Sequence, residues 1–266
     1  MKIGFIGLGN MATAMIGGII KNGIVQAEDI LGSDGFPASV ERAVNNLGIT
    51  AMDNNIATAQ KADVLVLSVK PQVYETVITE IKQFVKEDTI VISIAPGKTM
   101  NWVSGLFGFD EDAKLVRCMP NTPALVGEGC TGVCFSTGVN AEEKEVVMNI
   151  LNSFGKAYEV PEHLMDTVVG VSGSSPAYVF MFIEAMADAA VADGMPRNQA
   201  YEFAAQAVYG SAKMVLETGK HPAELKDMVC SPGGTTIEAV RVLEEKGFRS
   251  AIVEAQKACV SKSKNM

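Results

Sequence analysis

Short, uninterrupted apolar runs alternate with amphipathic segments over the first two-thirds of this 266-residue sequence. The VLVL run at residues 64–67 has no polar alternation, which is typical of parallel strands covered on both faces. The pattern predicts strands at residues 3–7, 30–33, 64–69, 90–94 and 114–118. Helices are expected between them at residues 11–22, 37–46, 55–61, 71–86 and 99–107. We therefore expect an α/β fold with a doubly wound, mainly parallel sheet, extended by strands near residues 132–135 and 157–160 around a helix at 141–154.

The strand pattern stops near residue 163, and the remaining chain is helical. Expected helices cover residues 176–193, 197–218, 222–228, 235–245 and 248–261, several of them followed by a capping glycine. Residues 177–191 are apolar on nearly all sides but too short to cross a bilayer, so we expect them to be buried inside protein. We predict a domain at 1–162 and an all-helical domain at 163–266 that buries surface against another subunit.

Composition excludes several classes of protein. The chain has 31 acidic and 22 basic residues, a net charge of −9, which argues against a protein that binds nucleic acid or anionic membranes. Five scattered cysteines without a CxxC pair indicate a reducing cytoplasm, and the N-terminus has no signal-peptide layout. With only His163 and His221 in the chain, we expect no metal site and no Ser-His-Asp machinery.

A glycine-rich turn, Gly7-Leu8-Gly9-Asn10-Met11-Ala12, follows the first predicted strand and opens the first predicted helix. This context is that of the dinucleotide-binding fingerprint of Rossmann-type sheets. The first glycine permits the tight turn, the second allows a pyrophosphate to approach, and the small third residue lets helix and strand pack closely. The sequence therefore predicts dinucleotide binding at the N-terminus of this helix.

Other candidate residues follow the later strands, where such sheets bind ligands. Ser33 could accept a 2′-phosphate, whereas Asp34 would repel one, so the sequence leaves the choice between NADP and NAD open. Lys70 could supply positive charge, a Pro96-Gly97 turn could bring backbone close to the nucleotide, and Asn121 could hold a nicotinamide. A solvated surface lysine and a purely structural loop are the respective alternatives for Lys70 and Asn121.

The segment Cys230-Ser231-Pro232-Gly233-Gly234-Thr235-Thr236 precedes a predicted helix near the end of the chain. Two glycines and several hydroxyls at a helix start leave N–H groups unpaired, which suits a carboxylate. A simple capping role for the serine and threonines is the alternative, but a glycine pair is poor for that purpose alone.

These motifs, in this order, resemble the pyrroline-5-carboxylate reductase family over essentially the whole chain. The matching segments are IGFIGLGNM at 3–11, VKP at 69–71, RCMPNTP at 117–123, GSSPAY at 173–178 and HPAELKDMVCSPGGTTIE at 221–238. The resemblance implies reduction of the cyclic imine 1-pyrroline-5-carboxylate to L-proline, the last step of proline biosynthesis, with hydride from NADPH or alternatively NADH.

The resemblance also implies roles for individual residues. Thr236 would be the catalytic residue, hydrogen-bonded to the ring nitrogen, while Ser231 and the N–H groups of Gly233, Gly234 and Thr235 would hold the carboxylate. An iminium substrate already carries its proton, which fits a site without histidine. The expected coenzyme contacts are Gly7, Leu8, Gly9, Asn10, Met11, Ser33, Asn55, Val69, Lys70, Pro71, Ala95, Pro96 and Asn121.

In this family the active site lies between the Rossmann domain of one subunit and helices of its partner. The resemblance therefore implies a homodimer joined through the helical domain, with a decamer of five dimers as a further state. Three residues depart from the family pattern: Ser175 in place of glycine, Pro96 in place of a small residue, and the acidic Asp34. A reductase of another cyclic imino acid and a non-catalytic NAD(P)-binding protein are the alternatives.

Overall fold

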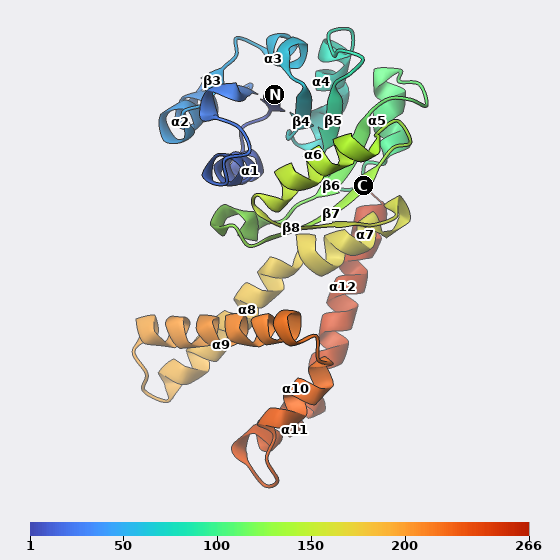
Figure 1. Ribbon diagram of the computed structural model, residues 1–266. Coiled ribbons are helices and arrows are strands. Elements are labelled where there is room, and N and C mark those ends of the chain that lie inside the picture. Colours follow the sequence, from blue (N-terminus) through green and yellow to red (C-terminus); the bar gives the residue numbers. More distant parts are fainter. Residues whose placement is uncertain (266) are drawn as a thin grey trace. The chain divides into compact units, whose positions relative to one another are not determined.

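The computed structural model describes residues 1–265, which form two compact units that we describe separately (Figure 1). The first unit comprises Met1–Ser174 and the chain from Cys259 on, and the second comprises Ser175–Ala258. The expected boundary between a Rossmann domain at 1–162 and an all-helical domain at 163–266 stays a prediction.

An eight-stranded sheet forms the centre of the first unit, with the strand order β3-β2-β1-β4-β5-β6-β7-β8. Neighbouring strands are parallel except for the antiparallel pair β6 and β7. The order reverses beside β1, as in doubly wound folds, so the prediction of an α/β Rossmann-type sheet is confirmed. The strands are β1 (Ile3–Ile6), β2 (Ile30–Ser33), β3 (Thr50–Ala51), β4 (Val64–Leu67), β5 (Ile90–Ser93), β6 (Leu115–Met119), β7 (Gly129–Phe135) and β8 (Gly155–Glu159).

Helices cover both faces of this sheet, and each face has its own apolar core. Phe5 and Val66 belong to one core, whereas Ile6 and Leu65 belong to the other. Successive residues of a strand are therefore both buried, which explains why the apolar runs show no polar alternation. The helices are α1 (Asn10–Lys21), α2 (Pro37–Leu47), α3 (Asn55–Lys61), α4 (Tyr74–Ile81), α5 (Met100–Phe107), α6 (Ala141–Asn152) and α7 (Met165–Val168).

Some elements differ from the expectation. The helix predicted for residues 71–86 is a 3₁₀ turn at Pro71–Val73 followed by α4, which ends at Ile81. The two residues of β3 are both exposed and carry no apolar period that would reveal a strand. A 3₁₀ segment at Thr122–Val126 and a π-helical turn at Val169–Gly173 also lie outside the predicted elements.

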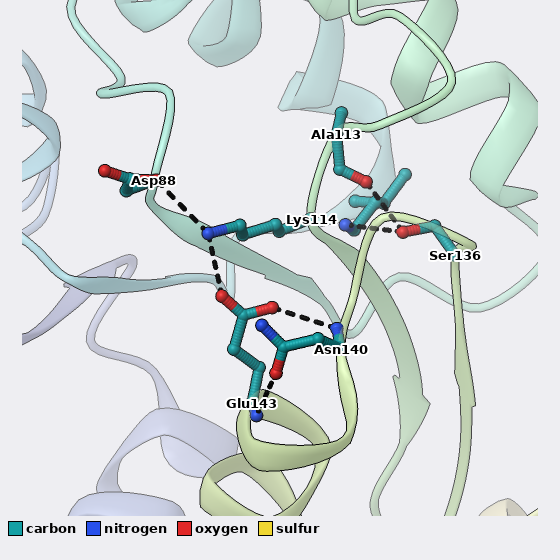
Figure 2. A network of polar contacts seen from close by, with 7 residues as sticks. Asp88, Ala113, Lys114, Ser136, Asn140 and Glu143 are labelled. Atoms are coloured by element: carbon teal, nitrogen blue, oxygen red, sulfur yellow. Dashed lines mark hydrogen bonds and ion pairs between the residues drawn. The ribbon is translucent and has the colours of Figure 1, made fainter.

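A polar network ties the start of β6 to the start of α6 (Figure 2). The Lys114 ammonium pairs with Glu143 at 2.7 Å and Asp88 at 3.3 Å, and Glu143 raises the pKa of this lysine. The side chains of Asn140 and Glu143 cap each other's backbone N–H groups in a capping box. These contacts lie at the amino end of β6, opposite the edge where the dinucleotide motif lies, so we assign them to stability.

The second unit is helical. It contains α8 (Ser175–Ala192), α9 (Arg197–Thr218), α10 (Pro222–Val229), α11 (Thr235–Glu245) and the beginning of α12 (Phe248–Lys264). The helices α8 and α9 pack against each other, with Ala187, Ala200 and Ala204 buried. Gly194, Gly219 and Gly247 all have positive φ, as expected of residues that end helices.

Within the single chain, Ala187 is the one residue of α8 that is buried, so the apolar surface expected to be covered by another subunit is exposed here. Small residues bring α8 and α9 together, while many large apolar side chains on both helices are exposed. The exposed ones include Phe180, Met181, Phe203, Tyr209 and Leu216. Within residues 1–265, one helical run, Glu162–Ala192, is long and apolar enough to cross a membrane by length and composition.

Candidate active site

The turn between β1 and α1 has the geometry that a dinucleotide requires. Gly7 has a φ of +96°, and a Cβ there would lie 2.8 Å from the backbone of Ser68, so only glycine fits. Gly9 precedes α1 without a side-chain cap, and a Cβ at this position would meet open space. The first N–H groups of α1 therefore have no partners within the helix, and the space beside Gly9 is open. Pyrophosphate binding needs both features.

Asp34 reaches this turn from the end of β2. One of its carboxylate oxygens accepts the N–H of Leu8 at 2.7 Å, and the other accepts the N–H of Phe36 at 2.8 Å. Both bonds are to backbone donors, so they fix the carboxylate directly against the glycine-rich turn.

Ser33 lies one residue earlier and is only 2% exposed. Its hydroxyl donates to the Asn55 amide oxygen at 2.9 Å and accepts from Thr58 at the same distance. Asn55 in turn donates to Glu80. The structure thus brings Ser33 and Asn55 together as neighbours in one hydrogen-bond network, in which Ser33 is the more buried residue.

The ends of β4 and β5 are held together by Tyr74, which the sequence did not single out. Its buried hydroxyl donates to the carbonyl of Leu67 at 2.6 Å and accepts the N–H of Ile94 at 3.3 Å. Burial raises the pKa of Tyr74 to about 12, so it stays a neutral donor at physiological pH. The predicted contacts at the ends of these strands differ in access: Lys70 is exposed, Val69, Pro71 and Pro96 are half-buried, and Ala95 is buried.

Asn121, after β6, is buried and joins two segments. Its amide nitrogen donates to the carbonyl of Ser172 at 3.0 Å, and its oxygen accepts the N–H of Cys130 at 2.8 Å. The side chain therefore holds the π-helical turn against β7. An amide nitrogen carries two N–H donors, which leaves one for a ligand.

The strand order places the predicted coenzyme contacts along one edge of the sheet. The ends of β2, β1, β4, β5 and β6 follow one another across the sheet, so Asp34, the glycine turn, Lys70, Ala95 and Asn121 share its carboxyl edge. An open helix N-terminus, a glycine with room beside it and a row of polar groups fit a dinucleotide along this edge.

The turn before α11 is the candidate substrate site of the second unit. Gly234 N–H donates to the Ser231 carbonyl at 3.0 Å, and Gly233 has a φ of +66°, so Pro232 and Gly233 occupy the centre of a tight turn. A Cβ on Gly234 would lie 2.4 Å from the Ser231 hydroxyl oxygen, which therefore sits directly over the helix start. The positive φ of Gly233 favours glycine, whereas a side chain at Gly234, whose φ is −79°, would displace the Ser231 hydroxyl.

No side-chain hydrogen bond caps α11. Its first N–H groups, including those of Thr235 and Thr236, have no partner within the helix. The role expected of the Gly234 N–H differs, because this group already closes the turn. The donors open to a carboxylate are the N–H groups of Gly233 and the two following threonines, together with the Ser231 hydroxyl.

Neither histidine and neither of the two buried cysteines shows features of a reactive group. His221 caps α10, its ring nitrogen accepting the N–H of Ala223 at 3.1 Å, and His163 is exposed. Burial raises the pKa values of the Cys118 and Cys134 thiols, the latter to about 11, which leaves both unreactive at neutral pH.

A Rossmann-type sheet with an open dinucleotide turn, followed by a helical unit with an open helix start, defines a nicotinamide-dependent oxidoreductase. The family "Pyrroline-5-carboxylate reductase dimerisation" matches residues 162–266, and the family "NADP oxidoreductase coenzyme F420-dependent" matches residues 2–97. The pyrroline-5-carboxylate reductase of Escherichia coli is 54% identical over 265 residues, covering 100% of this chain and 98% of that protein. The chain belongs to the pyrroline-5-carboxylate reductase family.

More distant relatives agree over the same length. The Methanosarcina acetivorans pyrroline-5-carboxylate reductase is 43% identical, with 100% of this chain and 97% of that protein aligned. The crystal structure of Plasmodium falciparum pyrroline carboxylate reductase, with NADP bound, matches with a TM-score of 0.91 at 34% identity, covering 100% and 97% of the two chains. A Coxiella burnetii pyrroline-5-carboxylate reductase structure gives a TM-score of 0.90 at 34% identity, covering 99% and 97%.

Proposed function

We propose that this chain reduces the C=N bond of 1-pyrroline-5-carboxylate to give L-proline, with NADPH or NADH as the reductant. The observation that carries this proposal is the uncapped start of α11, where Ser231, the glycine pair and the two threonines form an open anion site. The chain also aligns from end to end with relatives that are named pyrroline-5-carboxylate reductase.

The residues of the sheet edge bind and orient the coenzyme. A reduced nicotinamide, when bound, supplies the hydride that adds to the imine carbon. The N–H groups at the start of α1 neutralise pyrophosphate charge, and Gly9 leaves room for it. Asn10, Met11, Asn55, Lys70 and Asn121 complete the proposed coenzyme contacts, with Tyr74 as a positioning residue beneath the ends of β4 and β5.

The α11 turn binds the substrate. The free N–H groups of Thr235 and Thr236 and the Ser231 hydroxyl donate to the carboxylate, which the positive end of the helix also favours. We assign Thr236 to the ring nitrogen, where its hydroxyl orients the protonated imine. Holding the substrate in one orientation accounts for most of the catalysis, because an iminium needs no further acid.

The helices α8 and α9 have exposed apolar faces, and they lie within the residues that match the dimerisation family. We propose that the chain forms a homodimer through this helical unit and that dimers assemble further into a decamer. The apolar run Glu162–Ala192 then has a protein partner rather than lipid as its cover. We also propose a cytoplasmic location.

The experiment is a coenzyme-oxidation assay with the purified protein. Absorbance of NADPH and of NADH should fall only after addition of pyrroline-5-carboxylate, and proline should accumulate in equal amount. Comparing kcat/KM for the five-membered and six-membered imino acids separates this function from reduction of a larger ring. Coenzyme binding without turnover on either imine would contradict the proposal and favour a non-catalytic dinucleotide-binding protein.

A further inference from the structure

We infer that Asp34 makes this enzyme select NADH over NADPH. The inference rests on the proposed coenzyme site and adds the identity of the coenzyme to it. Asp34 stands directly after β2, which is where Rossmann-type proteins carry the group that distinguishes a ribose 2′-hydroxyl from a 2′-phosphate.

The position of the carboxylate is fixed by the backbone rather than by its own flexibility. Leu8, in the middle of the glycine-rich turn, donates its N–H to one oxygen at 2.7 Å, and Phe36 donates to the other at 2.8 Å. Any nucleotide whose pyrophosphate lies over Gly9 therefore has its ribose close to this anion. The carboxylate cannot turn away without leaving the Leu8 N–H unpaired.

The chemistry of the bound carboxylate favours a hydroxyl donor. Each carboxylate oxygen has about two lone-pair sites, so one remains on each after the backbone bonds are made. A ribose 2′-hydroxyl can donate to such a site. A 2′-phosphate instead brings about −1.5 to −2 charge to an existing negative charge.

Asp34 has no cationic partner in the described part of the chain that would offset that repulsion. No ion pair of residues 1–265 includes Asp34. The neighbouring Ser33 hydroxyl is 2% exposed and occupied by Asn55 and Thr58, so it does not reach a phosphate. Lys70 follows β4, which is separated from β2 by β1.

The test measures binding of NADH and NADPH to the substrate-free protein by titration calorimetry. We expect NADH to bind the wild type at least about 10-fold more tightly, because the carboxylate repels the 2′-phosphate of NADPH and accepts the 2′-hydroxyl of NADH. Asp34→Ser and Asp34→Asn should each shift the ratio of the two dissociation constants toward NADPH by about 10-fold or more. Asp53→Asn, an equal charge change at an exposed residue, should leave the ratio unchanged.

A probe on the unmodified protein guards against misfolded variants. 5′-AMP should displace NADH at lower concentration than adenosine 2′,5′-bisphosphate does. Tighter binding of NADPH or of the bisphosphate by the wild type, or an unchanged ratio in both folded Asp34 variants, would overturn the inference. Because substrate is absent, these results are independent of imine reduction: a protein that reduces the imine but prefers NADPH refutes only the role of Asp34.

Discussion

The two candidate sites of this chain use the same physical device in contrasting surroundings. Each is an uncapped helix start after a glycine-rich turn, at α1 in the first unit and at α11 in the second. The turn before α1 stands on a sheet whose two cores are complete within one chain. The turn before α11 belongs to a unit with large apolar side chains uncovered on α8 and α9. Coenzyme binding should therefore be a property of the single chain, whereas substrate turnover should depend on assembly.

The largest effect should come from breaking the assembly. Phe203→Glu places a charge on the exposed apolar face of α9, where Phe203 is 67% exposed in the single chain. An unpaired charge at a buried interface costs about 3–5 kcal/mol, so the homodimer should dissociate and kcat/KM should fall more than about 100-fold. Sedimentation and activity at matched concentration measure both effects.

Phe84→Glu is the control, because Phe84 is an exposed phenylalanine of the first unit. It should leave assembly and activity unchanged. NADH binding by Phe203→Glu should also persist. A Phe203→Glu protein that remains an active dimer would remove this face from the interface.

The next effect concerns Thr236. Thr236→Val keeps the shape of the side chain and removes its hydroxyl, so kcat should fall about 10- to 100-fold while the NADH dissociation constant stays the same. Thr236→Ser restores the hydroxyl and should recover most of the rate. Steady-state kinetics and coenzyme titration of the three proteins provide the measurement. An undiminished kcat in the valine variant would exclude Thr236 from the mechanism.

The two glycines of the coenzyme turn should respond differently to alanine. Gly7→Ala forces a Cβ into the Ser68 backbone at a φ of +96°, so unfolding free energy should fall by about 1–3 kcal/mol. Gly9→Ala meets open space at a φ of −73°, so stability should hold while coenzyme affinity drops about 10-fold. Denaturant melts and NADH titration separate the two. Equal losses of stability would contradict this account of the turn.

The smallest effect concerns Tyr74. Tyr74→Phe leaves the Leu67 carbonyl without its 2.6 Å donor, which should cost about 1–2 kcal/mol of stability at pH 7. The pKa of Tyr74 is raised to about 12, above its unfolded value of 10.0, so its stabilising contribution is complete below pH 10 and is lost toward pH 12. The stability difference between wild type and Tyr74→Phe should therefore shrink between pH 10 and 12. Denaturant melts across that range measure it, and a constant difference would contradict the assignment.

The sequence predicted most of the fold because its signals are local. Strands buried on both faces show as apolar runs such as residues 64–67, and glycines such as Gly219 end helices at positive φ. The short β3 and the π-helical turn at Val169–Gly173 have no such signal. The turn is held by Asn121, whose partner Ser172 is 51 residues away in sequence.

The sites were predictable to a different extent. The glycine motifs marked both turns, each of which contains a glycine with positive φ, Gly7 in the first and Gly233 in the second. Roles that depend on tertiary contacts could not be predicted. Three hydrogen bonds arise from the folded backbone and have no local signal. Ser33 donates to Asn55, the Leu8 N–H donates to Asp34, and the Gly234 N–H donates within its own turn.

One comparison tests the central claim that the α11 turn binds the substrate carboxylate. Initial rates of coenzyme oxidation are measured with pyrroline-5-carboxylate and with 1-pyrroline, the same ring without the carboxylate. We expect rapid, proline-forming oxidation with the first and a kcat/KM lower by at least about 100-fold with the second, since charge-assisted hydrogen bonds are lost. Equal kcat/KM values for the two rings, or no turnover of pyrroline-5-carboxylate with either coenzyme, would contradict it.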